Sequence, residues 1–415
     1  MSFNNQLEGW SSVKLKDISV GNKGNYGIGA SAVEYDDSLY TYLRITDITD
    51  DGRLNKEGLM SVDDEDAKNY LLYEDDIVFA RTGNSTGRSY FYEPSDGELV
   101  YAGFLIKFKL DRNKVNPRYI KLYTLTKQYR NWRDSFSTGS TRKNINAKMY
   151  GEMDIYIPPR KVQDNIVNII EPLNKKIEIN NKIHKNIEEM AQTIFKQWFI
   201  DFEFPNEDGK PYKSSGGKMV ESELGMIPKE WSLFGLGDLF TFKKGKKPKD
   251  IVEKQKSETY QKYLTIDVLN QNSELFALAD KVIECDDEDI LMVMDGASSG
   301  NIYTGMSGVV GSTLAKLEVK DSKLKSFIYQ LLKYKETDIK SHLTGSAIPH
   351  TDKAYISNQK IALPNNISVL KNSLYTFIII MQKIKINNLE TKKLQIMRDT
   401  LLPKLMSGEI RVNID

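Results

Sequence analysis

Two short loops in the first half of the chain carry side chains whose chemistry suits contact with a nucleic acid. They run over Arg81–Arg88 and Ser137–Asn144, and their glycines let the backbone approach a ligand closely. Arginine can pair with phosphates or guanine edges, and asparagine has the amide geometry to read adenine. The alternative is two tight turns with solvated charges. The candidate DNA-binding residues are Arg81, Thr82, Asn84, Ser85, Thr86, Arg88, Thr138, Ser140, Thr141, Arg142, Lys143 and Asn144.

The second half contains two similar loops, Asp295–Asn301 and Leu343–His350, which are poorer in arginine. The carboxylate of Asp295 can accept a hydrogen bond from cytosine N4. The lysine-rich stretch Lys243–Lys249 follows Phe242 and is interpreted with equal weight as a solvated loop or as a patch that positions phosphates. The candidate DNA-binding residues of this half are Lys243, Lys244, Lys246, Lys247, Asp295, Ser298, Ser299, Asn301, Thr344, Ser346 and His350.

Familiar catalytic patterns are missing. The pair Gly217-Lys218 is followed by Met219, so it forms no phosphate-binding P-loop, and no His-Glu-x-x-His pattern occurs. An adenine methyltransferase would show Asn/Asp-Pro-Pro-aromatic, whereas Pro158-Pro159 is followed by an arginine. The glycines near the N-terminus lack a preceding strand and make a weak case for a dinucleotide site. We therefore predict no catalytic residue and no metal site, and we assign any chemistry to a partner.

An internal repeat positions these loops. The segment at Trp10 recurs at Trp231, and Asp76–Gly83 is echoed by Asp289–Gly296. Three further pairs keep the same order: Tyr42–Ile48 with Tyr263–Leu269, Thr138–Ser140 with Thr344–Ser346, and Ile157-Pro158 with Leu363-Pro364. A unit of roughly two hundred residues has been duplicated. Two such loops, each present twice, favour ligand contact over simple turns.

Each repeat is predicted to contain a mixed sheet and a helix. Short runs rich in β-forming residues, bounded by Gly, Asp and Asn, indicate strands, and Pro117 suits the first turn of a helix. The predicted strands are Leu43–Ile48, Asp76–Ala80, Phe104–Leu110, Tyr263–Leu269, Ile290–Met294 and Thr313–Val319, and the predicted helices are Pro117–Tyr129 and Lys323–Tyr334.

A long helix is predicted over Val162–Phe199, because apolar residues recur alternately four and three positions apart. Its seam cannot be buried alone, and a similar seam near the C-terminus supplies a partner in which Asn387 corresponds to Asn180. The alternative, given equal weight, is two unrelated amphipathic helices. Pro172 is expected to kink or restart the first helix. The seam residues are Ile166, Ile170, Leu173, Ile177, Asn180, His184, Ile187, Ala191, Ile194 and Trp198, with Ser373, Phe377, Ile380, Ile384, Asn387, Thr391, Leu394, Arg398, Leu401 and Leu405.

Composition limits the class of protein. A chain of 415 residues with 40% hydrophobic residues has a prior of two or three ordinary domains. Its 58 basic and 57 acidic residues give a net charge of +1, which counts mildly against nonspecific coating of nucleic acid but not against local DNA-reading patches. The lone Cys285 and the lack of a long apolar run favour a soluble protein of the reducing cytoplasm.

A family resemblance rests on motifs that occur in a fixed order. They are Trp10–Ile18, Thr138–Asn146 leading into Ile155–Pro159 and Gln163, Phe195–Phe202, and Gly225–Trp231. In this order the chain resembles, over nearly its whole length, the specificity subunit of type I restriction–modification systems. The second repeat departs from the pattern, because it has Leu363-Pro-Asn-Asn in place of Pro-Pro and Gln, which leaves the start of the second helix open.

The resemblance implies an α/β mixed (α+β) fold with two target recognition domains, each followed by a long helix, the two helices packing as an antiparallel coiled coil. The expected boundaries are residues 1–157 and 227–364 for the recognition domains, 158–203 and 365–415 for the spacer helices, and 204–226 for a linker.

The resemblance also implies a non-catalytic subunit that reads a bipartite, asymmetric site in double-stranded DNA. Two modification subunits would bind S-adenosylmethionine and methylate adenine, and two restriction subunits would use ATP and Mg, so that no cofactor binds this chain. The rivals are a duplicated enzyme whose glycine loops bind a nucleotide, and an orphan specificity-like DNA-binding protein without active partners.

Overall fold

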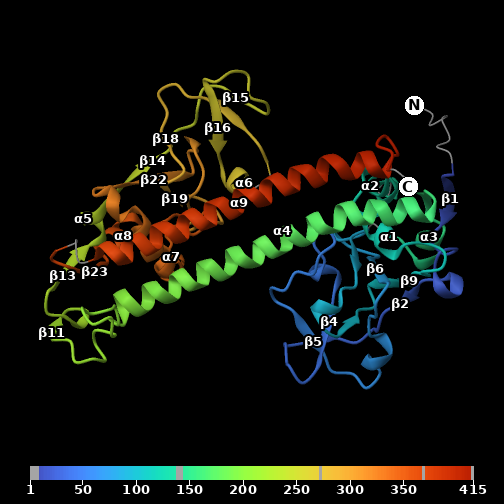
Figure 1. Ribbon diagram of the computed structural model, residues 1–415, viewed down its shortest axis with the longest axis horizontal. Coiled ribbons are helices and arrows are strands. Elements are labelled where there is room, and N and C mark those ends of the chain that lie inside the picture. The colour runs from blue at the N-terminus through green and yellow to red at the C-terminus, as the bar shows by residue number, and fades with distance from the viewer. Residues whose placement is uncertain (1–8, 137–143, 271–272, 367–369, 413–415) are drawn as a thin grey trace. The chain divides into compact units, whose positions relative to one another are not determined.

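The computed structural model describes residues 9–136, 144–270, 273–366 and 370–412 (Figure 1). The chain forms two compact units. Unit 1 comprises residues 1–178 and 392–415, and unit 2 comprises residues 179–391. Two long helices, α4 (Arg160–Phe195) and α9 (Lys371–Met406), each contribute one part to both units. Each unit therefore combines a globular domain with parts of both helices.

Unit 1 contains a pair of strands and two four-stranded sheets, with orders β1-β10, β2-β9-β6-β7 and β3-β5-β4-β8. Its strands are β1 (Ser11–Lys14), β2 (Asn25–Tyr26), β3 (Ala32–Val33), β4 (Tyr40–Leu43), β5 (Met60–Val62), β6 (Asp76–Ala80), β7 (Ser89–Phe91), β8 (Leu99–Tyr101), β9 (Leu105–Lys109) and β10 (Asp154–Ile157). Its short helices are α1 (Pro117–Tyr123), α2 (Lys127–Ser135) and α3 (Ala147–Gly151).

Unit 2 has a matching topology, with orders β13-β23, β14-β22-β19-β20 and β15-β17-β16-β21-β18; it adds a fifth strand, β18, to the last sheet and the hairpin β11-β12. Its strands are β11 (Met219–Ser222), β12 (Gly225–Pro228), β13 (Trp231–Gly235), β14 (Phe240–Lys244), β15 (Ile251–Val252), β16 (Tyr260–Leu264), β17 (Phe276–Leu278), β18 (Glu284–Cys285), β19 (Ile290–Val293), β20 (Ile302–Tyr303), β21 (Gly308–Val310), β22 (Leu314–Val319) and β23 (Lys360–Pro364). Its short helices are α5 (Leu236–Leu239), α6 (Ile266–Leu269), α7 (Lys325–Ser341) and α8 (Lys353–Asn358). The predicted mixed fold and its duplication are confirmed.

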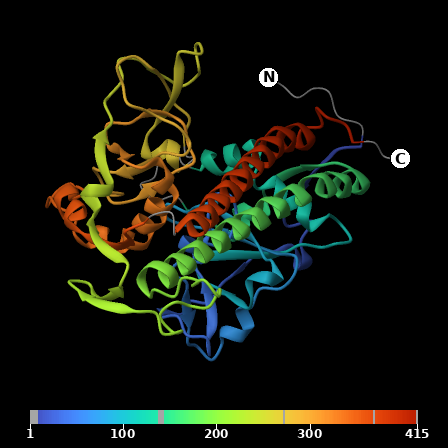
Figure 2. The same ribbon diagram turned by 60° about the vertical axis from the view of Figure 1, so that its left-hand side comes forward.

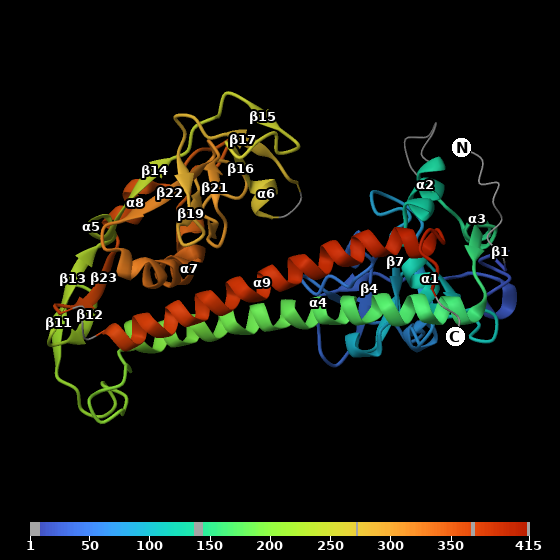
Figure 3. The same ribbon diagram turned by 45° about the horizontal axis from the view of Figure 1, so that its top comes forward.

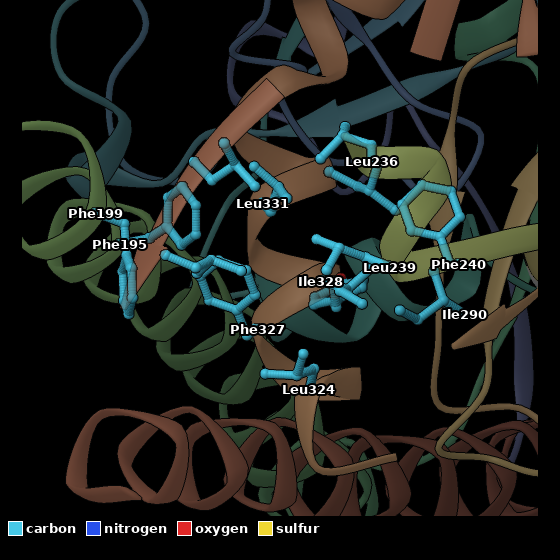
Figure 4. Packing of buried hydrophobic residues seen from close by; sticks show 14 of the residues in the cluster. Phe195, Phe199, Leu236, Leu239, Phe240, Ile290, Leu324, Phe327, Ile328 and Leu331 are labelled. Carbon is cyan, nitrogen blue, oxygen red and sulfur yellow. The ribbon is translucent and has the colours of Figure 1, made fainter. Parts of the chain in front are cut away.

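The central strands form because their residues are apolar and buried on both faces. All residues of β6 and all residues of β19 are buried, and each strand pairs antiparallel with two neighbours. In unit 1, Phe79 of β6 stacks on Tyr150, with ring centroids 4.8 Å apart. Figure 4 shows the corresponding core of unit 2, where Phe195 and Phe199 approach Phe327 of α7. These cores hold the loops that follow β6 and β19.

Within each unit, one part of α4 runs beside one part of α9 (Figures 2 and 3). In unit 1, Ile166 and Ile170 of α4 share a buried core with Leu402 and Leu405 of α9. In unit 2, Asn387 donates a hydrogen bond from Nδ2 to the backbone oxygen of Asn180 (2.7 Å). The order of these contacts makes the pair antiparallel. None of the seam positions predicted from the sequence is exposed.

The helix α4 continues through Pro172 into a π-helical turn at Lys196–Ile200, so the predicted restart at Pro172 is wrong, while the kink stays a prediction. The missing N–H of Pro172 costs one backbone hydrogen bond, but the flanking Ile166, Ile170 and Ile177 are buried and hold both adjoining turns in place.

Three predicted elements end early because polar side chains cap a new turn. Leu43–Ile48 is a strand only as far as Leu43, where the Asp47 carboxylate accepts a hydrogen bond from the backbone N–H of Arg44 (2.8 Å) and closes a 3-10 turn. In Tyr263–Leu269 the hydroxyl of Thr265 caps α6. The expected single helix over Pro117–Tyr129 is two helices, because Thr126 caps α2.

Candidate nucleic-acid interface

The loop after β6 is a closed backbone turn whose shape comes from small polar residues and glycine. The N–H of Gly87 donates to the oxygen of Ala80 (2.8 Å), and the hydroxyl of Thr86 donates to the oxygen of Gly83 (2.7 Å). Gly83 has φ +73°, a conformation that side chains rarely adopt. The loop therefore leaves strand β6, turns over and returns as β7.

The second loop of unit 1 is joined to this turn at its described end. Thr82 and Asn144 form an isolated antiparallel β-bridge, and the N–H of Ile145 donates to the oxygen of Arg81 (2.9 Å). The hydroxyl of Tyr150 donates to the oxygen of Ala80 (2.8 Å). Asn144 and Asn84 are exposed. Of the predicted contacts, Thr138, Ser140, Thr141, Arg142 and Lys143 lie outside the described residues.

Arg81 is held by an aromatic side chain that the sequence did not single out. Its guanidinium carbon lies 4.9 Å from the ring centroid of Tyr26, a cation–π geometry, and the Tyr26 hydroxyl accepts a hydrogen bond from the N–H of Ala147 (3.2 Å). Among the described residues, the buried Nε of Arg81 has no hydrogen-bond partner. Tyr26 thus orients a cation that has no ion-pair partner in the described part of the chain.

Three predicted contacts of this loop are engaged within the domain. The side chains of Ser85 and Thr86 are buried, and the Thr86 hydroxyl helps to close the turn. Arg88 is engaged inside the domain, because its Nε donates to Asp50 (2.8 Å) and its Nη1 to the backbone oxygen of Ile48 (3.0 Å). Of the two loop arginines in the described residues, Arg81 is therefore the better candidate for contact.

Unit 2 reproduces the backbone of this site. The N–H of Gly300 donates to the oxygen of Val293 (2.9 Å), the hydroxyl of Ser299 donates to the oxygen of Gly296 (2.8 Å), and the N–H of Thr351 donates to the oxygen of Met294 (2.8 Å). Ser299 is buried, and its hydroxyl helps to close this loop as Thr86 does in unit 1. Asp295 and His350 form the isolated bridge that corresponds to Thr82 and Asn144.

The side chains at this bridge differ from those of unit 1. The Nδ1 of His350 lies 2.8 Å from one carboxylate oxygen of Asp295, and the Nζ of Lys244 lies 2.7 Å from the other. Partial burial raises the pKa of Asp295, but the hydrogen bonds from Lys244 and His350 outweigh it and hold the pKa below its usual value. Asp295 is therefore ionised at neutral pH, and both of its oxygens are engaged.

The remaining predicted contacts of unit 2 differ in exposure and in whether they already have a partner in the described residues. Lys246 and Lys247 are exposed and have no ion-pair partner within the described ranges, whereas Lys243 pairs with Glu318 (2.8 Å). Asn301 donates to the hydroxyl of Tyr303 (3.3 Å). Thr344 and Ser346 are exposed, and Ser298 is half-buried.

A glycine follows the first strand of the corresponding four-stranded sheet in each unit: Gly27 after β2 and Gly245 after β14. The N–H of Gly27 donates to the oxygen of Leu105 (3.2 Å), as the N–H of Gly245 does to the oxygen of Leu314 (2.9 Å). A Cβ on either glycine would lie 2.2 Å from a backbone oxygen. Lys244 therefore occupies the place of Tyr26. We define the recognition positions as Tyr26, Arg81, Thr82 and Asn144 in unit 1, and as Lys244, Asp295 and His350 in unit 2; Met294, which corresponds to Arg81 in the repeat, is buried in the core.

No group of three or more His, Cys, Asp or Glu side chains is arranged to hold a metal ion in the described part of the chain. Among the helices of the described residues, none is long and apolar enough to cross a membrane.

The fold and the two matching loop clusters define a protein with duplicated recognition domains connected through two long helices. The family model described as type I restriction modification DNA specificity domain matches residues 7–189 and 228–395. The chain belongs to this family of type I restriction–modification DNA specificity domains.

Individual relatives agree with the family match. The chain is 36% identical over 141 residues to the type I restriction enzyme MjaVIII specificity subunit of Methanocaldococcus jannaschii, which covers 33% of each chain. It is 25% identical to the putative MjaX specificity subunit of the same organism, with 98% of this chain and 94% of the relative covered. A crystal structure of the S subunit of a type I restriction–modification system from M. genitalium has the same fold, with a TM-score of 0.62 and 18% identity over 98% of both chains.

Proposed function

We propose that this chain is the non-catalytic DNA-reading subunit of a type I restriction–modification complex, and that each unit reads one half of a bipartite target. The observation that carries the proposal is the repeated loop scaffold of units 1 and 2, which presents different side chains at the same recognition positions. Equal backbones with unequal side chains are expected of two domains that perform one task on two different sequences. The target is therefore asymmetric.

Unit 1 offers a cationic donor. The guanidinium fork of Arg81, stacked on Tyr26 and without an ion-pair partner among the described residues, suits bidentate pairing with guanine O6 and N7. Asn144 and Asn84 beside it are exposed amides that suit adenine. In unit 2, Lys246 and Lys247 suit phosphates, which position a protein on DNA without reading sequence.

The two long helices suit the role of a connector. Both α4 and α9 have 36 residues and take part in both units, so the chain is linked twice between its recognition domains. A helix pair with a buried seam resists bending more than a flexible linker does, and the spacing between half-sites then follows from helix length.

The surface of α9 suits partner subunits. Besides the seam that faces α4, the unit 2 part of this helix exposes a second apolar stripe at helical spacing: Tyr375, Ile379, Ile386 and Leu389. Exposed apolar residues in such a row are typical of a surface that packs against another helix. We assign this stripe to the modification subunits, which would bind S-adenosylmethionine and methylate adenine. The restriction subunits would join the same complex.

Selection from a random double-stranded DNA library tests this function. The full chain, purified with its modification subunits, is expected to enrich one motif with two fixed halves and a fixed gap. A matched pair of deletions, Asn180–Asn186 in α4 and Met381–Asn387 in α9, removes about 10 Å of each helix and nearly two turns, so the seams keep their faces. The gap is expected to shorten by about three base pairs while both halves persist.

Three results would contradict the proposal. An unchanged gap in the deletion variant would refute the connector role. Enrichment of a single undivided motif would refute the division between the units. Nucleotide turnover by the isolated chain without DNA would favour the duplicated enzyme instead.

A further inference from the structure

His350 is held in the second recognition site by its backbone and by a close neighbour of its ring. Its backbone exchanges two hydrogen bonds with Thr344, of 2.7 and 2.9 Å. Its ring packs against Gly345, where an added Cβ would lie 2.9 Å from the ring carbon Cδ2. The ring is half exposed, with 48% of the side-chain surface accessible. These contacts do not determine which ring nitrogen carries the proton.

The Asp295 carboxylate fixes that orientation. An ionised carboxylate only accepts hydrogen bonds, so the Nδ1 that lies 2.8 Å from it must carry the ring's proton. In a neutral imidazole the other nitrogen, Nε2, then bears a lone pair and is an acceptor. Lys244 donates to the second oxygen of Asp295 at 2.7 Å and keeps the carboxylate in place. Within the part of the chain that the structure describes, the hydrogen bond and the ion pair of the His350 ring both involve Nδ1, and none involves Nε2.

We propose that Nε2 of His350 selects a base with an exocyclic amine, adenine N6 or cytosine N4, at one position of the half-site that unit 2 reads. Both amines are hydrogen-bond donors in the major groove, whereas guanine and thymine present acceptors, O6 and O4, at the same place. An acceptor on the protein therefore discriminates between these pairs of bases. Lys244 and Asp295 are positioning residues in this scheme. The inference rests on the proposed function of the two units.

Unit 1 gives no such arrangement at its matching positions. The bridge there joins Thr82 to Asn144, and Tyr26 stands in place of Lys244. The amide of Asn144 offers a donor and an acceptor together, so it lacks the single polarity that Asp295 imposes on His350. The amine-selecting device thus belongs to one half-site only.

The substitution Asp295→Asn is expected to change Nε2 of His350 from a hydrogen-bond acceptor to a donor. Lys244 can only donate, so the amide oxygen of the new side chain must face Lys244 and its NH2 group must face Nδ1 of His350. Nδ1 then accepts, and Nε2 carries the proton and donates. The base preference at one position is expected to change from adenine or cytosine to guanine or thymine, by roughly tenfold or more. The substitution His350→Ala is expected to relax the same position.

The experiment repeats the selection at pH 8 with the full chain and its modification subunits, using the random double-stranded library as the probe. Arg81→Ala identifies the half-site of unit 1, because its relaxed position must lie in the other half. Glu318→Gln, which removes a charge paired with Lys243, and His342→Ala, a half-exposed histidine outside the loops, are the matched controls and should leave the motif unchanged. Circular dichroism verifies that each variant is folded.

The results distinguish failure of the His350 proposal from failure of the proposed DNA-reading function. If the unsubstituted complex selects no bipartite motif, the proposed function fails. If it does select one, but Asp295→Asn and His350→Ala leave the unit 2 half-site unchanged, the inference is overturned while the function stands. A folded Asp295→Asn variant whose position merely relaxes overturns the polarity argument. A change to guanine or thymine at that one position supports it.

Discussion

Replacing the buried Asn180 by leucine is expected to stabilise the helix pair. The side chain of Asn180 is fully buried; its Nδ2 donates to Glu390 (2.9 Å), but its Oδ1 has no hydrogen-bond partner among the described residues. The contact from Asn387 ends on the backbone oxygen of Asn180, so it survives the substitution. Asn180→Leu therefore removes an unsatisfied acceptor without breaking the contact between the two helices.

The magnitude follows from three contributions. An unsatisfied buried acceptor costs about 1–3 kcal/mol, and its removal recovers that amount. Burying a leucine side chain adds about 1.5–3 kcal/mol, part of which is lost to imperfect fit in a site shaped for asparagine. The hydrogen bond to the Glu390 carboxylate is lost; bonds to charged groups contribute about 1.5–3 kcal/mol, and the exposure of Glu390 places this bond at the lower end. The net expectation is a gain of about 1–3 kcal/mol in the free energy of unfolding.

Urea unfolding of the full chain, followed by far-ultraviolet circular dichroism, measures this difference as a shift of the helical transition to higher denaturant. Ile177→Ala, on the same seam and almost fully buried, is the control and should lose about 2–5 kcal/mol. If Asn180→Leu unfolds more easily than the unsubstituted chain, the polar pair is a net source of stability and the reasoning is wrong.

The remaining predictions concern DNA contact, pH and thiol chemistry. Arg81→Ala should weaken DNA binding by about 1–3 kcal/mol at one base position. Lys247→Ala should weaken binding to all sequences and lower by about one the slope of the logarithm of the binding constant against the logarithm of salt concentration. Equal losses across sequences for both variants would refute this division of roles. The hydrogen bond to Glu188 raises the pKa of His184 despite partial burial, so this pair stabilises unit 2 fully below the unfolded pKa of about 6.5 and loses that contribution as pH rises through the higher folded pKa. His184→Gln should therefore flatten the dependence of the unfolding free energy on pH between these two pKa values. An unaltered pH dependence in the variant would contradict the prediction. Burial raises the pKa of the Cys285 thiol to about 11, so alkylation at neutral pH should be slow in the native chain and fast in denaturant. Mass spectrometry measures both alkylation rates. Equal rates would show that the thiol is accessible in the native chain.

Much of the fold was predictable because the repeat imposes the same pattern twice. The strand predicted over Asp76–Ala80 has those bounds in the structure, and Ile290–Met294 is longer than β19 by one residue, since continuous apolar runs between turn residues have few alternatives. Leu43–Ile48 failed because β-forming residues continue past the strand, and the local hydrogen bonds of Asp47 outweigh their propensity.

The candidate site was predictable only in part. Serine and threonine in a glycine-rich loop can face a ligand or close the turn, and sequence does not distinguish these roles; Thr86 and Ser299 close the turn. Tyr26 was missed because β2 has only two residues and lies far along the chain from Arg81. The available signal was Gly27, whose close approach to backbone oxygens marks the strand as a tightly packed edge.

The division of labour within each loop cluster has an evolutionary consequence. The hydrogen bonds that shape the loops start or end mainly on backbone atoms and on the small residues Thr86 and Ser299, while the recognition positions contribute little to the core. Mutations at the recognition positions can therefore accumulate at a low cost in folding stability. Because the two units have separate cores, substitutions in the loops of one unit need not disturb the folding of the other. If each unit reads one half of the target, as proposed, the two halves can change independently of each other.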